Sequence, residues 1–185
     1  EDAAQAALLS WPAITVTAEK IEQSLKDVAA SVAVLDGDEI NDSAMDGLTA
    51  LEGRVPGLAF QPFGQAGLNS PVMRGLTANF NAFSTSTLLL VDGVPTLTAQ
   101  GFDDALLDID RIEVLRGPQS ILYGRNAEAG VIAIHSQPMD NQQRARVVAG
   151  LGSRDRQDLR LSLSQPLLED RLYASVAASW QQQDG

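Results

Sequence analysis

Few side chains in this sequence have the type and spacing that catalysis or metal binding requires. The 185 residues include one histidine, His135, and no cysteine, which excludes disulfides, thiolate catalysis and cysteine-based metal sites. Asp36, Asp38 and Asn41 lie close in sequence but miss the spacing of an EF-hand loop. No phosphate-binding glycine loop or nucleophile elbow occurs. We therefore predict that the chain is not an enzyme and holds no metal, and that His135 has a structural role.

The basic residues are mostly arginines, and Lys20 and Lys26 are the only lysines. A guanidinium is a forked donor suited to pairing with a carboxylate, so some arginines are expected in internal ion pairs, although a solvated surface role is equally compatible. The chain has 24 acidic and 13 basic residues and a net charge of −11, which excludes a nucleic-acid partner because phosphate binding needs clustered cations.

Short strands separated by glycine and proline must position these side chains. The pattern predicts a turn at 36–38, then a helix over 38–55 that begins at Asp42 or Ser43 and ends at Pro56. A second, short helix is predicted to open at Gly117-Pro118 and to end at Gly124. Strands are predicted over residues 31–35, 58–60, 72–75, 88–91, 111–116 and 131–134. The run 88–91 is apolar throughout, which is typical of a strand covered on both faces, whereas 111–116 alternates and predicts one buried face.

The pattern changes from residue 143 onward. Leu159, Leu161 and Leu163 alternate with polar residues, and residues 172–180 alternate in the same way, with turns predicted at 152–156 and from Pro166 to 170. Alternating segments of about ten residues are typical of membrane β-barrel strands. A soluble antiparallel meander with one wet face has the same periodicity, so the pattern leaves both interpretations open.

One long motif is specific enough to indicate a family. Residues 109–124 read IDRIEVLRGPQSILYG and are followed by Gly130-Val131-Ile132. Shorter matches precede them in order, and they are Ile14-Thr15-Val16-Thr17-Ala18, Val55-Pro56-Gly57-Leu58, Met73-Arg74-Gly75 and Leu90-Val91-Asp92-Gly93-Val94-Pro95. The chain thereby resembles the TonB-dependent outer-membrane receptors, most closely ferric-siderophore receptors of the yersiniabactin–pyochelin type. It departs from the family at Ala129, where glycine is usual, and at Ala133, where asparagine is frequent; we expect both to adjust local packing only.

The resemblance implies an α+β plug domain with a small mixed sheet and short helices, followed by the first antiparallel strands of a truncated transmembrane β-barrel. The implied boundaries are an N-terminal arm with a TonB box at 1–27, the plug at 28–140 and the barrel strands at 141–185. The family barrel has about 22 strands. At about ten residues a strand, the chain is expected to be a truncated piece of such a receptor.

The resemblance also implies a function. The plug would gate the import of an iron–siderophore complex through the outer membrane of a Gram-negative bacterium, with its arm in the periplasm and its barrel in lipid. TonB, with ExbB and ExbD behind it, would supply the energy, and the plug itself would bind no cofactor. Cobalamin, haem or a glycan remain alternative cargoes, because plug motifs identify the gate and do not identify the cargo. A standalone periplasmic binding or signalling module is the other alternative.

Three sets of site residues follow from the resemblance. Strand pairing with TonB is assigned to Ile14, Thr15, Val16, Thr17 and Ala18. Ion pairs between plug and barrel are assigned to Arg74, Arg116 and Glu113; the alternative is that the two arginines pair internally with Glu113 or Asp110. The loops 61–71, 78–86 and 94–102 would face the ligand, with contacts from Phe63, Phe80, Asn81, Phe83 and Gln100, unless these phenylalanines anchor the loops instead.

Overall fold

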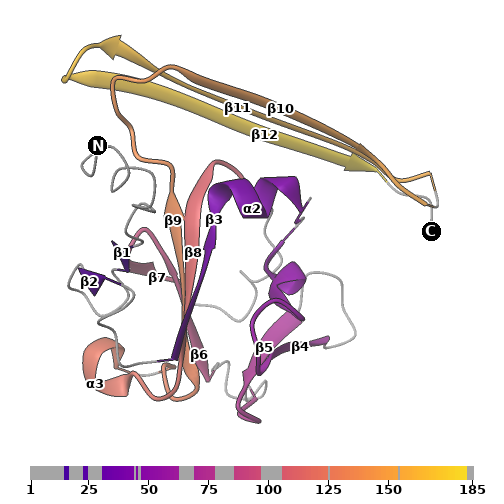
Figure 1. The fold of residues 1–185 in the computed structure, drawn as a ribbon, viewed down its shortest axis with the longest axis vertical. Coiled ribbons are helices and arrows are strands. Elements are labelled where there is room, and N and C mark those ends of the chain that lie inside the picture. Colours follow the sequence, from indigo (N-terminus) through magenta and orange to yellow (C-terminus); the bar gives the residue numbers. More distant parts are fainter. Residues whose placement is uncertain are drawn as a thin grey trace, which may run out of the picture.

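The computed structural model describes residues 15–16, 23–24, 31–43, 45, 47–62, 69–77, 86–96, 106–124, 126–153 and 155–182. These ranges form a five-stranded sheet, a separate three-stranded sheet, two pairs of short strands and three short helices (Figure 1). Within them, no helix is both long enough and apolar enough to cross a membrane.

A mixed sheet lies at the centre of the plug body, the name used below for residues 31–136. In spatial order its strands are β3 (Ser31–Asp36), β8 (Ile109–Arg116), β9 (Gly130–Ser136), β6 (Thr87–Val91) and β7 (Val94–Pro95). Neighbouring strands are antiparallel except β6 and β9, which are parallel. The small mixed sheet expected from the resemblance is therefore confirmed.

Both faces of this sheet are covered. Ile112, Val114 and Ile132 belong to a core that also contains buried side chains from residues 40–58. Leu115 and its neighbours form a second core on the opposite face. The sequence predicted one buried face for residues 111–116, but the structure buries both, because a separate apolar core packs against each face of the internal strand β8.

The predicted helix over 38–55 is wrong as a single element. A six-residue helix, α2 (Gly37–Asp42), begins after Asp36, whose carboxylate accepts a hydrogen bond from the Glu39 amide at 2.7 Å. A 3-10 turn, η1 (Leu48–Leu51), follows only after Gly47, which is fully extended. The predicted turn at 36–38 is thus the start of α2, and the predicted cap at Asp42 or Ser43 is its end. The predicted burial of the apolar side chains in this segment is nevertheless confirmed, since Leu48, Leu51 and Val55 are all buried.

A two-stranded unit next to η1 completes the cover over the first core. It pairs β4 (Leu58–Pro62) with β5 (Asn69–Met73) in antiparallel register. The predicted loop at 61–71 is therefore too long at both ends, because β4 continues to Pro62 and β5 begins at Asn69. Pro71 is compatible with β5 because, among the described strands, β5 pairs with β4 alone, and proline is found in edge strands.

The connection from β8 to β9 contains a single helical turn, α3 (Ser120–Tyr123). The prediction placed Pro118 at the first helical position, but the turn begins two residues later, after Gln119. Gly124 ends it with φ +78, as predicted for a C-terminal cap. The chain then enters β9 at Gly130, where any β-carbon would collide with the Leu115 carbonyl and approach the Met73 sulfur. Glycine is required at 130, whereas Ala129 fits into the core.

Three long antiparallel strands follow the plug body and are called the wall strands below. They are β10 (Arg144–Leu151), β11 (Gln157–Leu168) and β12 (Leu172–Gln182). Figure 1 shows them as a separate ribbon lying across the end of the plug sheet at which β9 leaves. The turn predicted from Pro166 to 170 begins too early, because β11 continues to Leu168; its second part is confirmed, since residues 169–171 form the turn to β12. Pro166 lies opposite Tyr173 of β12, beyond the end of β10, and the strand register is irregular between Pro166 and Leu168, where proline is tolerated.

The two faces of the wall strands differ in chemistry. Arg146 and Arg160 lie on the face turned toward the plug body and make contacts with it. The opposite face exposes apolar side chains, among them Val147, Leu151, Leu159, Leu161, Leu163, Val176 and Trp180. The alternation in the sequence thus gives the wall strands an apolar outer face and a polar inner face. The expected fold class is confirmed.

Candidate functional site

Two arginines from distant segments meet where β5 and β8 end. Arg74 has φ +53 immediately after β5, and its guanidinium lies over Gly117: a β-carbon there would come 3.2 Å from Nη1. Arg116 is the last residue of β8, and its Nη1 donates to the Pro56 carbonyl at 2.8 Å. The Arg74 amide donates to the next carbonyl, that of Gly57, at 3.4 Å. The structure therefore brings both predicted arginines to one turn.

Neither arginine has an acidic partner among the residues that the structure describes. The Arg116 Nε is buried and has no hydrogen-bond partner there. The alternative of internal pairing with Glu113 or Asp110 is wrong, because both carboxylates bind a different arginine, Arg111. A buried guanidinium N–H without an acceptor is unfavourable, so an anionic partner at this position would stabilise Arg116.

Glu113 is wholly buried on the second face of the sheet, with 0% of its side chain exposed. Its carboxylate accepts from the Arg111 Nε at 2.8 Å and lies 3.3 Å from the His135 Nε2. Arg111 also donates to Asp110 at 2.7 Å. Burial opposes the charge of Arg111, but its hydrogen bonds to Glu113 and Asp110 outweigh burial and raise its pKa. Glu113 thus pairs inside the plug body rather than with Arg74 or Arg116.

His135 reaches this cluster from β9, opposite Arg111 in the strand register. Across the described ranges, no three His, Cys, Asp or Glu side chains come together in a way that could hold a metal ion. Sequence reasoning missed the Arg111–Glu113 pair, although residues two apart on a strand share a face, which was the available signal.

Asp92 is a further residue that the sequence did not single out for a role. Its carboxylate accepts from the Ser136 amide at 2.8 Å and from the Ser136 hydroxyl at 2.9 Å. Its own amide donates to the Ile134 carbonyl at 2.9 Å, in a turn where Asp92 has φ +48. Asp92 therefore fixes the end of β9, just before the chain leaves the plug body for the wall strands.

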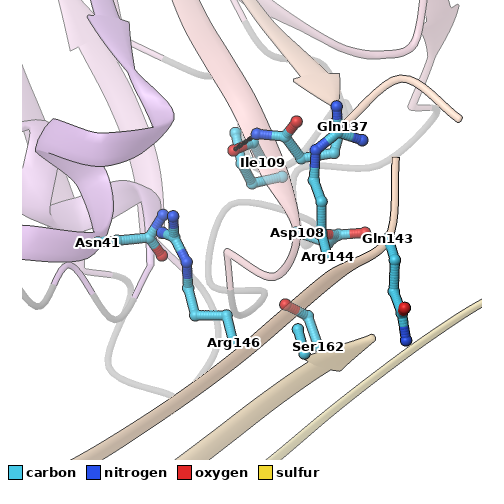
Figure 2. A pocket seen from close by; sticks show the side chains of 9 residues that line it. Asn41, Asp108, Ile109, Gln137, Gln143, Arg144, Arg146 and Ser162 are labelled. Atoms are coloured by element: carbon cyan, nitrogen blue, oxygen red, sulfur yellow. Dashed lines mark hydrogen bonds between the residues drawn. The ribbon is translucent and has the colours of Figure 1, made fainter. Parts of the chain in front are cut away.

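The plug body touches the wall strands across a narrow seam. Arg146 of β10 pairs with Asp38 of α2 at 3.2 Å, and Arg160 of β11 donates to the Met45 carbonyl at 2.8 Å. Beside these contacts lies a cavity of about 330 Å³ with a mostly polar lining (Figure 2). Side chains from both sides contribute to it, among them Asn41, Asp108, Gln137, Gln143, Arg146 and Ser162.

The linker between plug body and wall is held by a second set of bonds. Asn141 donates to the Asp170 carboxylate at 2.7 Å and accepts from the Asp170 amide at 3.0 Å, and the Tyr173 hydroxyl donates to it at 3.3 Å. Asp140 binds Arg144 through both oxygens, at 2.8 and 2.6 Å. Hydrogen bonds from Arg144 and from the Gln142 amide lower the pKa of Asp140.

The remaining predicted site residues are only partly placed. Thr15 and Val16 form β1 (Thr15–Val16), which pairs antiparallel with β2 (Gln23–Ser24). The other predicted TonB contacts, Ile14, Thr17 and Ala18, lie outside the described residues. The same is true of every predicted ligand contact, namely Phe63, Phe80, Asn81, Phe83 and Gln100.

A sheet-based plug that presents two arginines and leads directly into strands with an apolar outer face defines a class of protein. The family model of the TonB-dependent receptor plug domain matches residues 24–131, more than half of the chain. The chain belongs to this family.

Its relatives include bacterial receptors and a transporter. The pesticin receptor of Yersinia pestis is 33% identical over 175 residues, which cover 93% of this chain and 26% of that protein. The vitamin B12 transporter BtuB of Vibrio vulnificus is 34% identical over 145 residues, 76% of this chain and 23% of that protein. The solved structure of the ferric yersiniabactin uptake receptor FyuA from Yersinia pestis matches with a TM-score of 0.75 and 32% identity, over 81% of this chain and 24% of that one.

The chain thus spans about a quarter of the length of these relatives. The resemblance to siderophore receptors of the yersiniabactin type, inferred from the order of the matched segments, is confirmed. The similarity to a vitamin B12 transporter means that the family match alone does not select the cargo.

Proposed function

We propose that this chain is the gate of an outer-membrane receptor that imports an iron–siderophore complex and is energised through TonB. The observation that supports this most directly is the similarity to the ferric yersiniabactin uptake receptor, which covers 81% of this chain. In this proposal residues 1–27 are the periplasmic arm, 28–140 the plug and 141–185 the first strands of a barrel. The gate catalyses no reaction and binds no cofactor of its own.

The arginine pair is proposed to lock the closed gate. The Arg74 guanidinium lies against Gly117, the residue after Arg116, and the Arg116 Nε is buried without an acceptor in the described part of the chain. A carboxylate on a barrel wall would complete both groups with charge-assisted, forked hydrogen bonds. Such a pair holds the plug only while both partners are in place, because separating them leaves a desolvated charge.

Energy is proposed to enter at Thr15 and Val16 and their neighbours Ile14, Thr17 and Ala18. TonB, coupled to ExbB and ExbD in the inner membrane, would add a strand to this segment from the periplasm. β1 has a partner, β2, on one side only, so among the described strands its other edge is open for such pairing. The ligand is proposed to contact Phe63, Phe80, Asn81, Phe83 and Gln100 from outside.

The apolar outer face of the wall strands supports contact with outer-membrane lipid. Leu159, Leu161, Leu163 and Trp180 expose between 37% and 50% of their surface on the side away from the plug body. A soluble periplasmic module would need polar side chains on that face, because contiguous apolar surface of this kind is rare on soluble monomers. This face therefore favours the receptor over the standalone module.

Uptake by living cells tests the proposal. The complete gene product is expressed in a Gram-negative host without its own siderophore receptors, and import of radioactive iron as ferric yersiniabactin is measured in tonB-positive and tonB-deleted cells. We expect import only where receptor and TonB are both present. Radioactive cyanocobalamin is the matched alternative cargo. Uptake of cyanocobalamin without uptake of any ferric siderophore would assign the gate to the vitamin instead.

A further inference from the structure

Met73, the last residue of β5, and Arg74, which follows it, each lie over a glycine at one end of the connection between β8 and β9. A β-carbon at Gly130 would come 2.6 Å from the Met73 sulfur. A β-carbon at Gly117 would come 3.2 Å from the Arg74 Nη1, 3.7 Å from its Cζ and 3.9 Å from its Nη2, so the guanidinium covers this glycine. The Gly117 amide donates to the Ala129 carbonyl at 2.8 Å. Both contacts therefore lie where the chain leaves β8 and enters β9.

The backbone is strained at Arg74. Its φ of +53 is a left-handed conformation that residues other than glycine rarely adopt, and such a conformation persists only where surrounding contacts hold it. The Arg74 amide donates to the Gly57 carbonyl at 3.4 Å, and Met73 and Leu76 exchange amide-to-carbonyl bonds at 2.9 and 3.3 Å. The plug body thus fixes the turn from which the Arg74 side chain projects.

Arg116 is fixed by the same part of the chain. Its Nη1 donates to the Pro56 carbonyl at 2.8 Å, and the next carbonyl, that of Gly57, is the one that accepts from the Arg74 amide. The Arg116 Nε is already buried in this chain. All these contacts lie within the plug body, so they position the two arginines independently of the wall strands.

Two glycines of this connection differ in what surrounds them. Gly117 has φ +122 and Gly124 has φ +78, and both values belong to the region that favours glycine. A β-carbon at Gly124 would meet no described atom within 4 Å, whereas one at Gly117 would press on the Arg74 guanidinium. The backbone requirement is common to both glycines, but the contact with an arginine belongs to Gly117 alone.

We propose that Gly117 is a positioning residue of the gate, because its missing side chain leaves the space in which the Arg74 guanidinium lies. The turn at Pro56 and Gly57 fixes the backbone of Arg74 and the side chain of Arg116. The cationic half of the proposed lock is thus preformed in the plug body. This rests on the proposed function for what the arginines bind, whereas the positioning itself depends only on contacts within the plug body.

A double-mutant cycle in the complete receptor tests the positioning. Gly117→Ala is made with Arg74 present and in the Arg74→Ala background, and amide hydrogen exchange of peptides covering 109–116 and 130–136 is measured by mass spectrometry. The backbone strain of alanine at 117 is common to both backgrounds, so any difference between them reports the contact with Arg74. Gly124→Ala, made in the same two backgrounds, is the matched control.

We expect Gly117→Ala to accelerate exchange by a factor at least threefold larger when Arg74 is present than in the Arg74→Ala background. The factor for Gly124→Ala should agree within twofold between the two backgrounds. Equal factors for Gly117→Ala would overturn the proposal. Loss of all protection in both backgrounds would overturn it as well, because glycine would then be required at 117 by its backbone alone.

Leakage through the closed gate is a second readout. Gly117→Ala should lower the inhibitory concentration of a large antibiotic at least fourfold and should have no further effect where Arg74 is already alanine. A general loosening of the plug body would instead add to the effect of Arg74→Ala and would contradict the proposal. If Arg74→Ala itself causes no leakage, the proposed lock is wrong, whereas the exchange measurements still decide whether Gly117 positions Arg74.

Discussion

Replacing Glu113 by glutamine tests the internal cohesion of the plug body. The change keeps the shape of the side chain but removes its charge. The Glu113 carboxylate accepts a hydrogen bond from the Arg111 Nε at 2.8 Å, and the side chain is not exposed to solvent. Hydrogen bonds that involve a charged group contribute about 1.5–3 kcal/mol, against about 1 kcal/mol for neutral ones. Arg111 retains Asp110 at 2.7 Å, so its charge stays partly compensated.

Glu113→Gln is therefore expected to lower the free energy of unfolding by about 1–2 kcal/mol. This is less than the roughly 3–5 kcal/mol typical of a buried charge that has lost its partner. Because about 1.4 kcal/mol corresponds to a factor of ten, opening of β8 and β9 should become roughly 5- to 30-fold more frequent. Amide hydrogen exchange of peptides covering 109–116 and 130–136, followed by mass spectrometry of the complete receptor, measures this frequency.

The matched control is Asp38→Asn, which removes a carboxylate from an exposed ion pair. Exposed pairs contribute about 0–1 kcal/mol, so exchange in β8 and β9 should stay within about fivefold of the wild type. Equal exchange in the Glu113→Gln variant and the wild type would show that the buried pair does not stabilise the sheet and would refute this reasoning.

Four other changes have defined outcomes. Gly130→Ala forces a β-carbon into the Leu115 carbonyl and should destabilise the plug by about 1–3 kcal/mol, seen as a lower melting temperature; an unchanged melting temperature contradicts the packing. Arg116→Ala should weaken the closed gate and admit large antibiotics, with sensitivity in a growth assay as the measure, whereas the exposed Arg54→Ala should not. Val16→Pro should abolish uptake and spare ligand binding, since proline cannot pair as TonB requires; unimpaired uptake removes residues 14–18 from the mechanism. The lowered pKa of Asp140 means that its linker bonds are complete above its ordinary value of 3.8 and are lost as pH falls through the still lower folded value; a carboxyl NMR titration that gives 3.8 or higher contradicts the pairing with Arg144.

Local patterns were sufficient for most strands and for the family. Residues 131–134 are a continuous apolar run, and residues 159–163 alternate strictly between apolar and polar. Both patterns are typical of strands, and both ranges lie in strands. The helix over 38–55 failed because the apolar spacing of Leu48, Leu51 and Val55 also fits a 3-10 turn followed by a bend. Gly47, extended between the two helical pieces, was the neglected breaker.

The contacts that join distant segments of the chain could not be predicted from local sequence. Asp38 and Arg146 are separated by 108 positions, and Asp92 and Ser136 by 44. Their meeting depends on strand order and on the placement of the wall strands, which no periodicity encodes. Arg74 and Arg116 were found through the family motif, but the placement of the Arg74 guanidinium over Gly117, next to Arg116, depends on the positive φ of Arg74, which only the fold reveals.

The most direct test of the central claim is an experimental structure of the complete gene product in a membrane mimetic. The account predicts that β10–β12 continue into a closed wall of strands around the plug body, with a wall carboxylate within 4 Å of the guanidinium groups of Arg74 and Arg116, the distance that defines an ion pair. A structure in which residues 109–132 face solvent, with no strands enclosing them and no acidic partner for either arginine, would contradict it.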